Sequence, residues 1–530
     1  MFIRYILIVF ALFSIKVVIA QQEESKDSVK TTNLKEVVVT GQYSKQSVDK
    51  AVFQVKVIPR TVIDNLAANN LADVLNQTLN INIIPNASSG KSGVQLFGLD
   101  SQYFKILVDN IPLINDEGLG NNTDLTQLNL DDVEQVEIVE GSMGVQYGSN
   151  AVSGIINIIT KKSSKYKWQI TPYLQEETIS NEYGLFDQGR HIQSLKVGHN
   201  FSNNWYINGT YTRNDFAGHF GDREGQNYEF NDGNRGYEWL PKLQNNAKAL
   251  IRFNTEKTSA FYRLEYFDER VSRYDSVVRT NLNSATQTTN PTASDEIFTS
   301  ERFNHHFNLT GNLFKTANYD VSFSYQQQKR NVETYNYRIK TQEEFDNEFF
   351  EYESRKGLYS RGTLNNLFTN NWSNYQLGYE ISSIDGYSSS LAGDFETDNI
   401  KRRIENYDVF TSAEYSLSEK ISLRPGIRVM FSSKFDVQSA FSLSSRYLFK
   451  NGFQLRAVLG SAPRNPNYDE LFTYFVDVNH DVQGNDQINP ERGYSGFLHL
   501  KKDFWTTDEN WLLRNKLSAW YMSVDDRIEL

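Results

Sequence analysis

Apolar and polar residues alternate with a period of two along most of the chain after residue 162. In one such segment the apolar or small residues Trp205, Ile207, Gly209 and Tyr211 alternate with Tyr206, Asn208, Thr210 and Thr212. Successive side chains of a β-strand point to opposite faces, so each segment has one apolar and one polar face. The pattern recurs at 260–266, 319–325, 375–381, 409–417, 421–429 and 453–459. It predicts a mainly β protein.

The connections between these segments favour a membrane barrel over a soluble sandwich. Long polar stretches at 217–237 and 270–300 alternate with short turns, as extracellular loops and periplasmic turns do in outer-membrane barrels. Sandwiches more often have connections of about 2–6 residues. The mean hydropathy of -0.55 is compatible with a barrel, because only alternate residues of its strands face lipid. We therefore expect a transmembrane antiparallel β-barrel over residues 163–530.

The N-terminus resembles an export signal. Arg4 precedes an apolar run from Tyr5 to Ile15, which is shorter than the roughly 20 residues of a membrane-spanning helix. We expect a signal peptide at 1–20 and a flexible polar tail at 21–50. The chain has no cysteine, so it forms no disulfide, and its net charge of -11 argues against a nucleic-acid partner.

A compact α+β domain is expected between the tail and the barrel, at residues 51–162. Leu66, Leu71, Val74, Leu75 and Leu79 recur at helical spacing. Residues 104–108 and 133–139 have the pattern of strands.

The end of this domain carries a distinctive motif. Residues 133–162 combine an acidic strand, a glycine turn, a Tyr-Gly-Ser step and a final apolar strand, represented by Glu137, Gly141, Tyr147-Gly148-Ser149 and Gly154–Ile159 before Thr160-Lys161. This order closely resembles the end of the plug domain of TonB-dependent outer-membrane receptors. The segment departs from the family pattern at Glu140, where an Arg is usual, and at Ser142, where a Pro is usual. The resemblance implies a plug inside the lumen of the barrel.

Further segments extend the resemblance over nearly the whole mature chain. Residues 94–99 and 106–113 resemble the paired strands of the plug, with Asn110 replacing the glycine of the turn; Asn tolerates the left-handed backbone that such a turn needs. Residues 461–472 and 484–491 resemble paired motifs late in the barrel of the family.

The short apolar patch before the plug lies where the family has its TonB box. It consists of Leu34, Lys35, Glu36, Val37, Val38, Val39 and Thr40. An extended β-branched segment can add as a strand to the sheet edge of a partner. The same residues could instead form an ordinary first strand of the plug.

The resemblance implies active import across the outer membrane of a Gram-negative bacterium, with TonB as the periplasmic partner and outer-membrane lipid around the barrel. The cargo would be a scarce small-molecule nutrient such as a ferric siderophore, haem or cobalamin. No enzymatic activity and no cofactor are expected.

His480 lies between the two late motifs, where haem-importing members carry an axial histidine, and a neutral imidazole can bind iron. A single loop histidine is more often merely solvated, and residues 51–162 contain no second histidine.

An outer-membrane barrel enzyme is the alternative from another class. The sequence has neither a Gly-x-Ser-x-Gly nor a His-Glu-x-x-His motif, and the adjacent His305 and His306 would point to opposite faces of a strand. A signalling receptor would need a longer N-terminal tail, and a plug opposes a passive porin.

The number of strands suggests an incomplete barrel. Plugged transporters have 22 strands, and strands recur here roughly every 25 residues, so residues 163–530 supply about 15. Closure at 22 strands would need roughly 550 residues by the same spacing. We therefore expect the barrel to be incomplete at the C-terminus, as in a fragment, a frameshifted gene, a split chain or a non-functional truncated receptor.

Overall fold

The computed structural model describes residues 37–87, 89–114, 124–179, 182–221, 232–314, 316–370, 372–388, 402–476, 481–505 and 511–529. The expected signal peptide, most of the expected tail, the first three residues of the expected TonB box, and His480 lie outside these ranges. Within them, no helix is long and apolar enough to cross a membrane.

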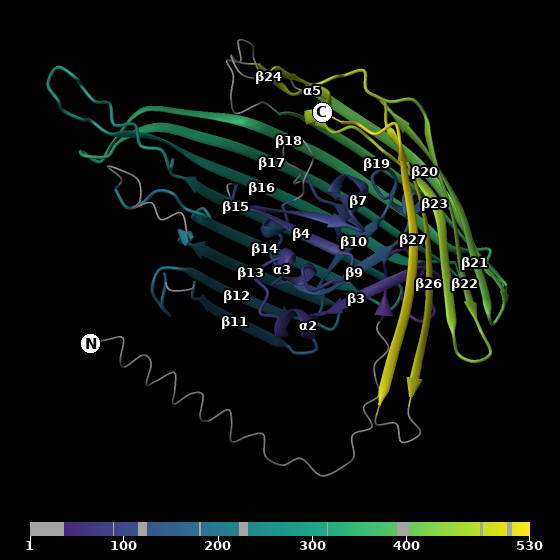
Figure 1. The fold of residues 1–530 in the computed structure, drawn as a ribbon. Coiled ribbons are helices and arrows are strands. Elements are labelled where there is room, and N and C mark those ends of the chain that lie inside the picture. Colours follow the sequence, from purple (N-terminus) through teal and green to yellow (C-terminus); the bar gives the residue numbers. More distant parts are fainter. Residues whose placement is uncertain are drawn as a thin grey trace, which may run out of the picture. The chain divides into compact units, whose positions relative to one another are not determined.

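One antiparallel sheet of 15 strands dominates the fold (Figure 1). Its strands, in spatial order, are β11 (Trp168–Glu177), β12 (Arg190–Asn200), β13 (Trp205–Phe216), β14 (Lys242–Asn254), β15 (Thr258–Arg273), β16 (Thr292–Leu313), β17 (Ala317–Arg338), β18 (Glu343–Leu367), β19 (Ser373–Ser388), β20 (Arg402–Ser418), β21 (Ile421–Ser432), β22 (Gln438–Leu448), β23 (Gln454–Arg464), β26 (Glu491–Trp505) and β27 (Leu512–Asp525). The expected mainly β fold with about 15 barrel strands is confirmed. No ladder joins β11 to β27 within the described ranges, and the expectation of further strands stays a prediction.

The two faces of this sheet have opposite polarity. Ile207 and Tyr211 on β13 are 40% and 51% exposed, whereas Asn208 and Thr210 between them are 7% and 5% exposed. The apolar face therefore points outward and the polar face points inward. A soluble sandwich would bury the apolar face instead, so the pattern is that of a membrane barrel.

The two ends of the barrel differ in the length of their connections. Short turns at 201–204, 255–257, 419–420 and 449–453 join strands at one end. Longer segments, such as 217–241 and 274–291, join them at the other end. Short turns mark the periplasmic end of outer-membrane barrels and long loops the extracellular end. β17 and β18, with 22 and 25 residues, exceed the roughly 9–11 residues needed to cross the membrane.

The plug contains two small sheets. A five-stranded sheet has the order β3 (Gln54–Pro59), β9 (Val133–Glu140), β10 (Gly154–Thr160), β7 (Phe104–Val108) and β8 (Ile111–Pro112). A second sheet contains β4 (Ile81–Asn86), β5 (Lys91–Leu96) and β6 (Leu99–Asp100). The strands predicted at 104–108 and 133–139 are thus confirmed. At the turn between β7 and β8, Asp109 and Asn110 have φ values of 51° and 67°, the left-handed backbone expected there.

The helical spacing at residues 66–79 extends beyond the helices that form. α2 (Arg60–Asn65) ends before Leu66, and α3 (Leu71–Leu75) ends before Leu79, which is 84% exposed. Asn70 starts the second helix, because its side chain accepts hydrogen bonds from two backbone amides of the first turn. Leu71 and Leu75 pack into the core of the plug with residues of β7, β9 and β10.

Candidate functional site

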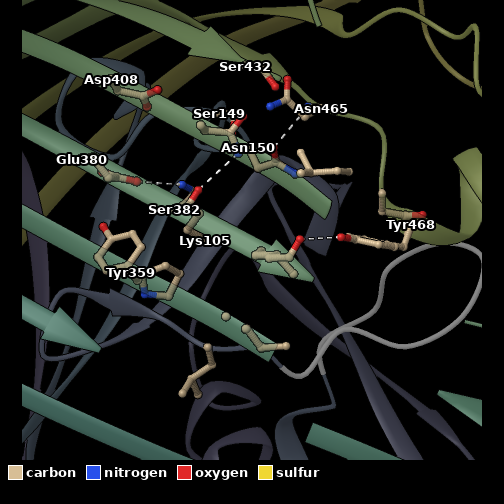
Figure 2. A pocket seen from close by; sticks show the side chains of 18 of the residues that line it. Lys105, Ser149, Asn150, Tyr359, Glu380, Ser382, Asp408, Ser432, Asn465 and Tyr468 are labelled. Carbon is tan, nitrogen blue, oxygen red and sulfur yellow. Dashed lines mark hydrogen bonds and ion pairs between the residues drawn. The ribbon is translucent and has the colours of Figure 1, made fainter. Parts of the chain in front are cut away.

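A cavity of about 270 Å³ lies between the plug and the strands on the extracellular side (Figure 2). We call it the outer cavity. The plug contributes Lys105 from β7 and Asn150 from the segment after α4 (Gly144–Tyr147). The barrel contributes Glu380 from β19, Asp408 from β20, and Tyr468 from α5 (Tyr468–Phe472).

Apolar side chains form much of the remaining wall. They come from both parts of the molecule: Ile106, Leu113 and Ile114 of the plug, and Ile384, Met430 and Phe435 of the barrel. Small-molecule sites commonly combine such a wall with a few polar groups that fix the orientation of the ligand. The outer cavity therefore has the composition of a ligand site.

A cluster of charges lies at the inner end of this cavity. Glu380 forms ion pairs with Arg428 at 2.9 Å, with Arg361 at 3.0 Å and with Lys105 at 3.9 Å. Arg428 also pairs with Asp408. Burial lowers the pKa of the Lys105 ammonium, and the nearby Glu380 carboxylate opposes this shift.

The late-barrel motif at 461–472 positions α5 over the cavity. Asn467 and Glu470 form a capping box at the start of α5, and Arg464 pairs with Glu470. The Tyr468 hydroxyl then lies 2.7 Å from the carbonyl oxygen of Ile384 and 2.8 Å from that of Arg402. These contacts tie the loop to β19 and β20 beside the cavity.

A second cavity, of about 590 Å³, lies near the short turns at the periplasmic end. We call it the inner cavity. Its lining includes Tyr43, Asn110, Tyr147, Tyr319 and Arg361. Tyr43 lies just after the expected TonB box, so this part of the tail faces the inner cavity.

The last four residues of the expected TonB box contact the plug. Val37 and Val38 form β1, which pairs with β2 (Gln46–Ser47). Val38 and Thr40 are fully buried. The backbone amides of Val39 and Thr40 donate to the carboxylate of Glu137, at 3.2 Å and 2.8 Å. In this conformation residues 37–40 pack on the plug rather than standing free.

Buried ion pairs hold the other side of the plug to the barrel. Asp132 pairs with Lys248 and lies 3.8 Å from Arg263. Burial alone would raise the pKa of Asp132, but Lys248 and Arg263 hold it below its usual range. At the edge near β27, Glu140 pairs with Lys516 at 2.7 Å. This residue departs from the family pattern, and a barrel cation matches its charge.

No group of three or more His, Cys, Asp or Glu side chains in the described part of the chain is arranged to hold a metal ion.

Comparison with protein families decides the identity of the fold. Residues 47–155 match the TonB-dependent receptor plug domain. Residues 252–530, more than half of the chain, match the TonB-dependent receptor-like β-barrel. The chain is a TonB-dependent receptor.

Individual relatives of the receptor differ in cargo. It is 22% identical to the vitamin B12 transporter BtuB of Vibrio vulnificus (strain CMCP6) over 482 residues, 91% of this chain and 69% of that protein. The siderophore receptor PirA from Acinetobacter baumannii superposes with a TM-score of 0.66 at 13% identity, over 90% of this chain and 78% of that one. The copper transporter OprC gives 0.65 at 15% identity, over 89% and 71%.

The receptor is therefore a transporter of the Gram-negative outer membrane rather than an enzyme, and it belongs to a family that interacts with TonB and binds small molecules.

Sequence reasoning missed Lys105, Glu380, Asp408 and Arg428 as site residues. A signal for three of them was present. Glu380 lies between Tyr379 and Ile381, Asp408 between Tyr407 and Val409, and Arg428 between Ile427 and Val429. All three are therefore charges on the inward face of an alternating strand.

Proposed function

We propose that the receptor imports a ferric siderophore, haem or cobalamin, and that the cargo binds first in the outer cavity. One observation carries this proposal: an apolar-walled cavity with charges at its inner end lies on the extracellular side of the plug. The relatives support the range of cargo, since they include a vitamin B12 transporter and a siderophore receptor.

Direct binding measurements test the cargo. Purified receptor is titrated with cyanocobalamin, hemin, ferric enterobactin and Cu²⁺, the last because a copper transporter shares the fold. We expect tight binding of one of the first three, and uptake of the same compound that depends on both the receptor and TonB. Binding of Cu²⁺ alone would replace the proposed cargo with a metal ion, and binding of none would overturn the proposal.

A matched pair of substitutions tests the location. Ile384 lines the outer cavity, whereas Ile381 on the same strand is 40% exposed on the outward face. Ile384→Trp should fill part of the cavity and weaken binding of the identified compound by about tenfold, which is about 1.4 kcal/mol. Ile381→Trp should bind normally, because aromatic side chains are common on the lipid face. Equal affinities for the two variants would place the site elsewhere.

His480 becomes important only if hemin is the compound that binds. We propose that its imidazole is then a ligand of the haem iron. His480→Ala should lower hemin affinity by about tenfold or more. Unchanged hemin binding would show that His480 is not a ligand of the iron. The binding site would then consist of the outer cavity alone.

We also propose that residues 34–40 are the TonB box. Their last four residues, Val37 to Thr40, are β-branched and lie on the plug near the periplasmic end, where TonB acts. Val38 belongs to β1, so this segment is already extended enough to pair with another strand.

A further inference from the structure

A single turn of the plug separates the two cavities. Lys105 and Glu380 line the outer cavity. Gln146, Tyr147 and Arg361 line the inner cavity. These five residues meet at the C-terminal end of α4. The shortest route between the two cavities therefore crosses α4 and the charged residues around it.

Three cations converge on the last carbonyl groups of α4. Arg361 donates to the carbonyl oxygen of Gln146, and Lys105 donates to that of Tyr147. Arg428 lies 3.4 Å and 3.5 Å from the carbonyl oxygens of Val145 and Gln146. Cations at this end of a helical turn satisfy carbonyl groups that have no partner within the helix.

Glu380 holds the three cations in place. Among the described residues it is the only carboxylate within 4.0 Å of Lys105 or of Arg361, and it also pairs with Arg428. Its side chain is only 8% exposed, and it lines the outer cavity. A cargo in the outer cavity can therefore contact the carboxylate that all three cations share. Asp408, the second partner of Arg428, lines the same cavity.

The barrier at α4 is closed in this conformation. A Cβ atom at Gly144 would lie 2.3 Å from the carbonyl oxygen of Ser461, and one at Gly148 would lie 2.8 Å from Nη2 of Arg428. At these two positions the plug and the barrel leave no space for a side-chain atom, so passage at this point requires α4 to move.

The same turn has one unsatisfied group and one link to the tail. Within the described part of the chain, neither polar atom of the Gln146 amide has a hydrogen-bond partner, although the residue is only 2% exposed. Such a group costs about 1–3 kcal/mol. The Tyr147 hydroxyl accepts from the backbone amide of Gly41, next to the proposed TonB box. Movement of α4 would give the Gln146 amide access to hydrogen-bond partners, and it would break the hydrogen bond between Tyr147 and Gly41.

We propose that α4, held by Lys105, Arg361 and Arg428 around Glu380, is the gate through which cargo passes from the outer to the inner cavity. This proposal rests on the import function proposed above. Glu380 acts as a positioning residue, because it acts on α4 through the three cations. The rest of the plug stays seated while the gate opens.

A reversible cross-link tests the gate, and the absence of native cysteine makes it specific. A Cβ atom at Gly426 on β21 would lie 2.9 Å from Cγ1 of Val145 on α4, so the pair Val145→Cys and Gly426→Cys is within reach of a disulfide. With cyanocobalamin, hemin or ferric enterobactin as the probe, we expect the oxidised receptor to bind normally and uptake to fall by about tenfold or more. A reductant should restore uptake.

A second cross-link distinguishes a local gate from release of the whole plug. The Ser194 hydroxyl on β12 donates to Asp131 at 3.0 Å, so Asp131→Cys and Ser194→Cys would lock the opposite side of the plug. Uptake should continue with this lock. Continued uptake with α4 locked, or equal loss with either lock, would overturn the gate.

A third measurement needs no cargo, so the gate can fail or succeed independently of the import function. Glu380→Gln keeps the size of the side chain but removes the charge that holds the cations. We expect cells with this variant to admit vancomycin, which is too bulky for general porins, about tenfold more readily. The control is Glu269→Gln, because Glu269 is a buried carboxylate of β15 that accepts a hydrogen bond from Gln127 of the plug, pairs with Lys242 and lines neither cavity. Equal entry of vancomycin in the two strains, at equal receptor levels, would overturn the gate even if no probe is imported.

Discussion

At the scale of single residues, Glu137 determines how the start of the described chain is held. It is fully buried on β9 and accepts hydrogen bonds from the backbone amides of Val39 and Thr40. Asn157 on β10 adds a bond to the Thr40 hydroxyl at 2.8 Å. One carboxylate and one amide side chain therefore help to hold the end of the proposed TonB box on the plug.

Glu137→Ala should release this segment. It leaves two backbone amides without their acceptor, and each unsatisfied group costs about 1–3 kcal/mol. We expect hydrogen exchange at residues 38–42 to become faster while exchange in β7 and β10 stays slow. Faster exchange throughout the plug would mean instead that Glu137 supports the whole domain.

Val38→Pro should abolish uptake with little change in the affinity for cargo. Proline lacks the backbone N–H that a strand donates, so the segment could not pair with a strand of TonB. The control is Val37→Thr, because Val37 is 46% exposed and threonine keeps the β-branched shape. Uptake and equilibrium binding are measured in parallel. A proline variant that binds poorly but imports what it binds would remove these residues from energy coupling.

At the scale of elements, α4 packs closely against β23, and the sequence of its four residues alone does not predict this contact. Gly144 starts the turn against β23, and the contact leaves no room for a side chain there. Close approach of two backbones is a role for which glycine is suited.

Gly144→Ala should therefore loosen the plug. The added methyl group would lie 2.3 Å from the Ser461 carbonyl oxygen and 2.8 Å from the Cβ atom of Ala462, so α4 or β23 must shift. We expect a loss of about 1–3 kcal/mol in the free energy of unfolding of the plug, measured by urea titration. Gly184→Ala, at a position with no atom within 4 Å of the added carbon, should leave the titration unchanged.

At the scale of the whole molecule, buried ion pairs fasten the plug to distant strands. Asp132 reaches Lys248 on β14 and Arg263 on β15, and Asp109 lies 3.8 Å from the same Arg263. Burial opposes the charge on Asp109, but Lys162 and Arg263 lower the pKa of Asp109. Both carboxyl groups therefore stay ionised at pH values below those at which an aspartate usually takes up a proton.

The pKa shift of Asp132 predicts how seating of the plug depends on pH. A carboxyl group whose pKa is lowered on folding adds stability above its unfolded pKa of about 3.9, and this stability is lost as the pH falls through the folded value. The stability of the plug within the barrel should thus not change through this group between pH 7 and about 5. It should fall only in stronger acid. Urea titrations of the plug at several pH values measure this.

Asp132→Asn should weaken seating at neutral pH as well, by about 3–5 kcal/mol, because it leaves Lys248 without its buried partner. Asp131→Asn is the matched control, since hydrogen bonds from the hydroxyl groups of Ser194 and Thr212 reach that side chain. Similar losses in the two variants would show that the ion pair has no special role.

Local patterns in the sequence determined the barrel, its faces and the turn at Asp109 and Asn110, because these depend on the period of a strand and on the backbone that each residue tolerates. The family followed from motifs whose residues are close together in the chain. Only the tertiary structure brought Lys105 to Glu380 and Arg428, which lie hundreds of positions later, on β19 and β21. Their meeting depends on the register of many antiparallel pairs and on how the plug sits among them. The physical reason is that the alternation along one strand fixes the face on which a charged side chain lies. The residue with which that charge forms an ion pair depends instead on the register across the whole sheet.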